Sequence, residues 1–176
     1  AFADRHLGLH SADRTTVPEE VFVAWGDRVS EWCDVEASVS LARAAPALPE
    51  TPAMERIVGK GIGCRIGLAF DEAFHFYYDD NLRRLESLGA ELVRFSPIHD
   101  AHLPDVDGLY FGGGYPEVHA EELSRNLSMR KDVAAFGEVQ GPIYGECGGL
   151  MYLSNGIRTL DGTLHPMAGL IPGEAE

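Results

Sequence analysis

Residues 142–153 read PIYGECGGLMYL: a short apolar segment runs into a cysteine flanked by glycines, and a second apolar segment follows. This order predicts a strand that turns sharply into a helix, with Cys147 at the turn and its side chain exposed above the sheet. The glycines allow the close backbone approach that such a turn needs. Unpaired N–H groups at the start of the helix would favour a thiolate. We interpret Cys147 as a nucleophile; the alternative is a cysteine buried in the core.

Strands and helices alternate from Cys64 onward. The apolar spacing predicts strands at 65–70, 91–95, 106–111 and 142–145, and helices at 81–88 and 120–140, the latter with a break near Asn126. Such alternation implies right-handed crossovers and an α/β fold with a parallel sheet covered on both faces. Reactive groups gather at the carboxyl ends of the strands in these sheets. Cys147 lies at that edge, as do Asp71 and the glycines at 112–114.

Residues 1–63 differ in character from the alternating part. Apolar positions at helical spacing predict a helix over 19–43, and Pro18 followed by two glutamates marks its start. Three prolines within 46–52 prevent regular structure there. We therefore predict a helical segment at 1–45, a linker at 46–63 and a separate domain at 64–176.

The composition argues against several classes of function. The formal net charge is −14 at pH 7, which disfavours binding to nucleic acid or anionic membranes. No apolar run is long enough to span a bilayer, and the first residues lack the order of a signal peptide. The three cysteines are widely spaced, which argues against a disulfide framework or a zinc site and for a reducing compartment. We expect a cytoplasmic protein.

A run of glycines follows the strand predicted at 106–111. Residues 111–117 read FGGGYPE, and consecutive glycines let backbone N–H groups converge on one point, which suits a developing oxyanion. The N–H of Gly148 would add a donor from the cysteine turn. No Gly-Lys-Ser/Thr follows, so this is not a phosphate loop. A plain turn that needs positive φ is the alternative.

Three segments together resemble one enzyme family: DEAFHFYYDDNL at 71–82, DGLYFGGGYPEVHAEEL at 107–123 and GECGGLMYL at 145–153. They are similar to the cobyrinic acid a,c-diamide synthases, which are corrinoid-type class I glutamine amidotransferases. The resemblance runs from about residue 64 to the end, and residues 5–9, RHLGL, resemble the closing part of the family's synthetase domain. One departure is that the family has proline where this chain has Gly112, from which we expect a slightly looser loop.

The resemblance implies an incomplete, flavodoxin-like amidotransferase domain at 64–176, preceded at 1–45 by the tail of an ATP-dependent synthetase domain. In such an enzyme a cysteine attacks the side-chain amide of glutamine, forms a thioester and releases ammonia. The synthetase domain then uses ATP and Mg²⁺ to amidate two acetate carboxylates of a corrin ring. Carried over to this chain, Cys147 is the nucleophile, and Gly113, Gly114 and Gly148 are the oxyanion donors.

The resemblance also places essential parts outside this chain. The catalytic base is expected beyond residue 176, and the phosphate loop belongs to the synthetase domain. We therefore expect no cofactor bound to this chain, no metal site, and negligible glutaminase activity from the chain alone.

Other residues have weaker claims to a role. His165 is more simply a surface or edge-strand residue than the base. His99 and His102 are spaced like a metal pair, but they lie in a loop without further ligands, so we expect a solvated loop. The stretch at 71–80 would face the partner domain or the ring substrate, or else its aromatic residues cap the core. The remaining interpretations are substrate positioning for Glu117, ordinary packing for Cys33 and Cys64, and a helix face seeking cover for Trp25 and Trp32.

Three alternatives stay open. One is amidation of a related tetrapyrrole, such as hydrogenobyrinic acid or a nickel sirohydrochlorin. Another is cobyric acid synthase, which shares the cysteine domain, although the aromatic run at 74–78 favours the a,c-diamide enzyme. The third is a non-catalytic flavodoxin-like binding module in which Cys147 is inert or senses redox state.

Overall fold

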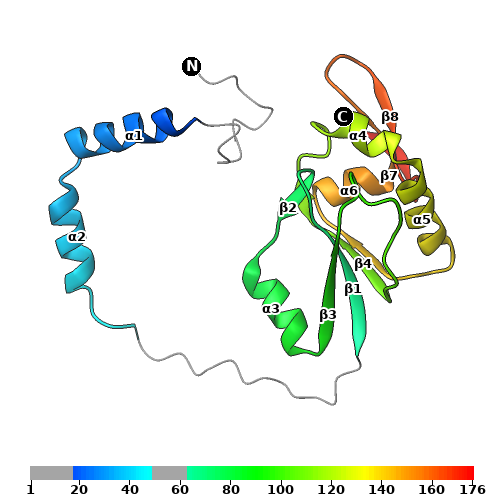
Figure 1. Ribbon diagram of the computed structural model, residues 1–176, viewed down its shortest axis with the longest axis horizontal. Coiled ribbons are helices and arrows are strands. Elements are labelled where there is room, and N and C mark those ends of the chain that lie inside the picture. The colour runs from blue at the N-terminus through cyan, green and yellow to red at the C-terminus, as the bar shows by residue number, and fades with distance from the viewer. Residues whose placement is uncertain (1–17, 49–62) are drawn as a thin grey trace. The chain divides into compact units, whose positions relative to one another are not determined.

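The computed structural model describes residues 18–48 and 63–176 (Figure 1). The chain divides into two compact units, Ala1–Ala53 and Met54–Glu176. The RHLGL segment and most of the predicted linker lie outside the described residues. Within the described ranges, no helix is both long and apolar enough to cross a membrane.

Over residues 18–48, the first unit holds two helices where the sequence predicts one. Helix α1 spans Glu19–Trp32 and α2 spans Val35–Ala44. The backbone at Cys33 is extended, with φ −120° and ψ 137°. The side chain of Asp34 then accepts a hydrogen bond from the N–H of Ala37 at 2.8 Å. The single helix over 19–43 is therefore wrong, because Asp34 is a good N-cap that starts a new helix.

Neither helix of the first unit has a buried residue. Cys33 is exposed, so its interpretation as a packing residue is wrong, whereas Cys64 is half-buried in the second unit. Trp25 and Trp32 both lie on α1 and are partly exposed, and their interpretation as a helix face that seeks cover stays a prediction. Large apolar side chains exposed on the two helices are Val23, Trp25, Val29, Trp32, Val35, Val39 and Leu41.

A four-stranded parallel sheet organises the second unit, which confirms the α/β prediction. Its strands are β1 (Cys64–Ala69), β3 (Ala90–Phe95), β4 (Gly108–Phe111) and β6 (Ile143–Gly145), in the order β3-β1-β4-β6. The helices are α3 (Asp79–Ser87), α4 (Ala120–Arg125), α5 (Leu127–Glu138) and α6 (Gly148–Leu153). The predicted helix break is confirmed at Asn126, whose side chain caps α5 by accepting the N–H of Met129.

The core lies between one face of this sheet and helices α4 to α6 (Figure 1). Alternate residues of the strands point to that face, and full burial of an apolar side chain stabilises by about 1.5–3 kcal/mol. Packing in the core fixes α6 against β4, and so fixes the turn that precedes α6. The largest contributors are Phe95, Leu109, Phe111, Leu123, Met129, Val133 and Tyr152.

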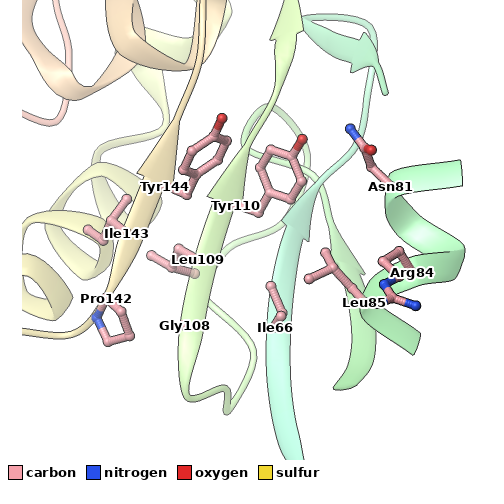
Figure 2. A pocket seen from close by; sticks show the side chains of 10 residues that line it. All are labelled: Ile66, Asn81, Arg84, Leu85, Gly108, Leu109, Tyr110, Pro142, Ile143 and Tyr144. Atoms are coloured by element: carbon pink, nitrogen blue, oxygen red, sulfur yellow. The ribbon is translucent and has the colours of Figure 1, made fainter. Parts of the chain in front are cut away.

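The opposite face of the sheet is covered only in part by α3 among the described residues. A groove of about 580 Å³ runs between α3 and strands β1, β4 and β6 (Figure 2). Leu85 of α3 and Ile66 of β1 lie on one side of it, and Tyr144 of β6, which is 58% exposed, lies on the other.

Two smaller sheets complete the second unit, and the sequence did not predict them. Strands β2 (Phe74–Phe76) and β5 (Gly113–Gly114) pair antiparallel, while β7 (Ser154–Arg158), β8 (Leu164–Pro166) and β9 (Ile171–Ala175) form a sheet in the order β8-β7-β9. Phe74 pairs with Gly114, and Phe76 with Gly113. This pairing places the aromatic stretch beside the glycine run.

Candidate active site

Cys147 lies at the turn between β6 and α6 with φ 49° and ψ −114°. Positive φ is uncommon outside glycine and costs about 1–3 kcal/mol, so such residues cluster at functional sites. The cysteine is exposed. The predicted turn is confirmed, and the alternative of a buried core cysteine is excluded.

Backbone hydrogen bonds tie the turn to the glycine run. The N–H of Glu146 donates to the carbonyl of Phe111, and the N–H of Gly149 donates to the carbonyl of Gly112, each at 3.0 Å. A Cβ on Gly149 would lie 2.7 Å from Cβ of Phe111, and a Cβ on Gly148 would lie 2.7 Å from Cδ of Pro116. Both positions therefore need glycine, since a side chain would push the turn away from β4 and its loop.

The structure brings the predicted donors next to the cysteine. A Cβ on Gly113 would lie 3.7 Å from Cβ of Cys147, and a Cβ on Gly148 would lie 3.2 Å from the nitrogen of Gly114. None of the glycines at 112–114 has positive φ, so the alternative of a positive-φ turn is excluded. Their function as oxyanion donors stays a prediction.

Gly112 differs from its neighbours because its N–H already has a partner. It donates to the hydroxyl of Tyr77 at 2.9 Å. A proline at this position could not make that bond. The expectation of a looser loop stays a prediction.

Glu146, which sequence reasoning did not single out, holds two tyrosines at the end of the sheet. Its carboxylate accepts hydrogen bonds from Tyr110 at 2.8 Å and from Tyr144 at 3.4 Å. These tyrosines are register partners on β4 and β6 and lie side by side in Figure 2. Burial, and then the hydrogen bond to Glu146, raises the pKa of Tyr110 above its usual range. The only indication of this role in the sequence was that Glu146 directly precedes Cys147.

Asp71 lies at the predicted sheet edge, but both of its carboxylate oxygens are used in structural bonds. One accepts the N–H groups of Ala73 and Phe74 at 2.9 and 3.2 Å. The other accepts the hydroxyl of Ser96 at 2.8 Å and the N–H of Ile98 at 3.0 Å. Asp71 thus fixes the loop after β1 against the loop after β3.

The stretch at 71–80 divides between its two interpretations. Phe74 is fully buried and belongs to the core, as the core-capping alternative predicts. Phe76 is 44% exposed and Tyr78 75% exposed. A contact between these exposed rings and a partner domain or ring substrate stays a prediction.

The histidine candidates lie in ordinary surroundings. Exposed His99 pairs with Glu72 at 3.0 Å and exposed His102 with Asp132 at 2.9 Å, as expected of a solvated loop. His165 lies in β8, an edge strand of the three-stranded sheet. In the part of the chain that the structure describes, no three His, Cys, Asp or Glu residues are grouped to hold a metal ion. Half-buried Glu117 follows Pro116, and its proposed positioning of substrate stays a prediction.

Residues 65–176 match the model of the CobB/CobQ-like glutamine amidotransferase domain. The chain belongs to this family. The match covers the four strands of the parallel sheet except for Cys64, the first residue of β1, together with the glycine run and the cysteine turn. The loop and turn described above are thus parts of an amidotransferase domain.

The amidotransferase chain also resembles curated proteins named cobyrinate a,c-diamide synthase. It is 49% identical over 170 residues to that of Leptospira interrogans serovar copenhageni and 51% identical over 169 residues to that of Syntrophotalea carbinolica. The alignments cover 97% and 96% of this chain, and 37% of each relative's own length. The chain thus spans little more than a third of these relatives. A solved structure of a peptidase E-type protein from Listeria monocytogenes EGD-e matches with a TM-score of 0.49 and 18% sequence identity. The match covers 62% of this chain and 63% of that one.

Proposed function

We propose that this chain supplies the glutaminase half-reaction of a cobyrinate a,c-diamide synthase. Family membership supports glutamine as the amide donor, and the names of relatives 49% and 51% identical support the corrinoid substrate. The observation that carries the chemistry is the exposed Cys147 in strained backbone, beside the loop that begins at Gly112.

In the proposed reaction, the thiolate of Cys147 attacks the side-chain amide carbon of glutamine. The carbonyl oxygen becomes an oxyanion in the tetrahedral adduct, the C–N bond then breaks, and the nitrogen leaves as ammonia once protonated. The remaining γ-glutamyl thioester is hydrolysed by water to glutamate and the free thiol.

The oxyanion needs donors that are already in place before it forms. We assign this role to the backbone N–H groups of Gly113, Gly114 and Gly148, which the loop and the turn bring together beside Cys147. Because backbone groups are held by the fold, they need little reorganisation when the charge develops. Removal of one such donor typically costs a factor of about 10²–10³ in rate.

The rest of the reaction belongs to the whole protein. We assign residues 1–45 to the end of a synthetase domain, 46–63 to a linker and 64–176 to the amidotransferase domain. The synthetase domain would use ATP and Mg²⁺ to activate two carboxylates of the corrin, which ammonia then converts to amides. The three free cysteines support a reducing compartment, and we place the enzyme in the cytoplasm.

Selective labelling tests the proposal. A glutamine analogue that carries an electrophilic diazoketone should modify Cys147 at least about tenfold faster than Cys33 or Cys64, as read by peptide mass spectrometry, because a preformed site concentrates the reagent at the thiol. Exposed Cys33 is the internal control for accessibility. Iodoacetamide, which does not resemble glutamine, should show a smaller preference. Equal rates at all three cysteines with the analogue would instead favour a non-catalytic binding module.

A further inference from the structure

Tyr77 connects the end of the first strand to the glycine loop. Its hydroxyl donates a hydrogen bond to the carbonyl of Ala69, the last residue of β1, and accepts the N–H of Gly112 at 2.9 Å. These two bonds use the single proton of the hydroxyl and one of its lone pairs. The Gly112 peptide is thereby tied to the central sheet.

The ring of Tyr77 also fills the space in which a side chain at position 112 would lie. A Cβ on Gly112 would be 2.5 Å from Cε1 and 2.6 Å from Cζ of Tyr77. The ring is itself held, stacked on Phe70 with centroids 5.9 Å apart and edge-on to Tyr110 at 5.2 Å. The Tyr77 ring can therefore occupy this position only because residue 112 has no side chain.

The same residue is also bonded to the cysteine turn, through the carbonyl of its following peptide. The carbonyl of Gly112 accepts the N–H of Gly149, two residues after Cys147, at 3.0 Å. The next residue along the loop, Gly113, is the one whose Cβ position lies 3.7 Å from Cβ of Cys147. A change in the backbone at Gly112, which joins these two bonded peptides, would therefore move the proposed donors relative to the sulfur.

Burial keeps the Tyr77 hydroxyl in its donating form. Desolvation raises its pKa well above the usual range, and the charges of Asp71 and Glu146 add to this effect, outweighing the bond from Gly112. The hydroxyl therefore stays protonated at any pH at which the enzyme would work.

We propose that Tyr77 is a positioning residue of the glutaminase site: its hydroxyl sets the orientation of the Gly112 peptide and so the distance between the glycine loop and Cys147. This inference rests on the proposed function, because the loop position matters for rate only if the loop stabilises the oxyanion.

Tyr77→Phe tests the hydroxyl while it keeps the ring. We expect the rate of Cys147 labelling by the diazoketone analogue to fall about tenfold, the factor that corresponds to the loss of roughly one buried hydrogen bond. Labelling by iodoacetamide, which needs no oxyanion site, should change less than about twofold. Tyr78→Phe is the matched control, because it removes a hydroxyl from the neighbouring tyrosine, which is 75% exposed.

A double-mutant cycle tests the contact with Gly112 independently. Gly112→Ala should lower the analogue labelling rate about tenfold or more in the native background, since the methyl group would clash with the ring. In a Tyr77→Ala background the same substitution should cost less than about twofold, because the space is then empty. If Gly112→Ala lowers the labelling rate by the same factor in both backgrounds, the inference is overturned. This result can be read even if Tyr77→Phe destabilises the fold.

The outcomes separate this inference from the proposed function. If the unsubstituted chain labels its three cysteines equally, the proposed function fails, and the role of Tyr77 fails with it. If the unsubstituted chain is selective for Cys147 but Tyr77→Phe behaves like Tyr78→Phe, only the role of Tyr77 is overturned.

Discussion

Cys147 occupies a backbone conformation that glycine adopts more readily than any other residue, with φ 49° and ψ −114°. The core that holds β4 and α6 imposes this conformation, so the strain is offset by packing elsewhere. The thiol is therefore held at the surface by β4 and α6, which pack into the core.

The strain at Cys147 gives a stability prediction. Cys147→Gly should be more stable than Cys147→Ala by about 1 kcal/mol in urea unfolding, because glycine tolerates positive φ and alanine does not. Both variants lack the thiol and should release no ammonia, so activity cannot explain the difference. Equal unfolding free energies for the two variants would contradict the strain.

At the residue scale, sequence reasoning found Cys147 because its glycines lie beside it in the chain. It missed Tyr77 and Glu146 because their partners are far away: Gly112 is 35 residues from Tyr77, and Tyr110 is 36 residues from Glu146. Only the strand order brings these pairs together. Gly112 shows the same limit, because the sequence alone does not show that its N–H is bonded to Tyr77.

At the scale of elements, Asn126 ends α4 and begins α5. Its side-chain oxygen accepts the N–H of Met129 at 3.3 Å, while its amide nitrogen donates to the carbonyls of Pro97 and Asp100 at 2.9 and 2.8 Å. The break therefore also fastens both helices to the loop after β3. The sequence predicted the break from local pattern, but not this second function.

Asn126→Ala should accordingly lower the free energy of unfolding of the second unit by about 2 kcal/mol, because a helix cap and the hydrogen bonds to the loop after β3 are lost together. Asn81→Ala, at an exposed position of α3 that borders the groove, is the matched control and should change stability by less than about 0.5 kcal/mol. Chemical denaturation monitored by circular dichroism measures both. The prediction fails if the two variants unfold at the same denaturant concentration.

The connection between β7 and β8 gives a prediction on pH. Hydrogen bonds from the Thr159 hydroxyl and then from the Thr163 N–H lower the pKa of Asp161 to about 2 from 3.8. A lowered folded-state pKa stabilises the turn above the unfolded value, and this contribution is lost as pH falls from about 4 towards 2.

An NMR titration of the Asp161 carboxyl carbon should therefore show a midpoint near 2. Thr159→Val, which removes the first donor at nearly constant volume, should move the midpoint upward. A native midpoint at the ordinary value for aspartate would show that the bonds are not made in solution.

At the scale of the whole molecule, the chain carries two units, of which the second holds the proposed chemistry. The class of this unit followed from the alternation of strands and helices, because that alternation is local. The three-stranded sheet was missed because β7 directly follows α6, and its partners β8 and β9 are only 3 and 5 residues long. Helical spacing predicted helix in the first unit, but as a single helix and not as α1 and α2.

The chain alone should not complete the reaction. It spans 37% of the length of its relatives, and we place the general base and the ATP site in the remainder. Incubation with glutamine should give no ammonia above the level of a Cys147→Ala control in a coupled glutamate dehydrogenase assay. Steady ammonia release that this substitution abolishes would show that the chain already holds every group it needs.

The proposed chemistry at Cys147 requires that neighbouring backbone amides receive a developing negative charge. An aldehyde analogue of glutamine forms a tetrahedral adduct with a thiol, and ¹H–¹⁵N spectra can follow each glycine amide as the adduct forms. We predict large downfield proton shifts at one or more of Gly113, Gly114 and Gly148, with Gly162 and Gly173 unchanged. An adduct on Cys147 that leaves all three of the first group unshifted would contradict the account.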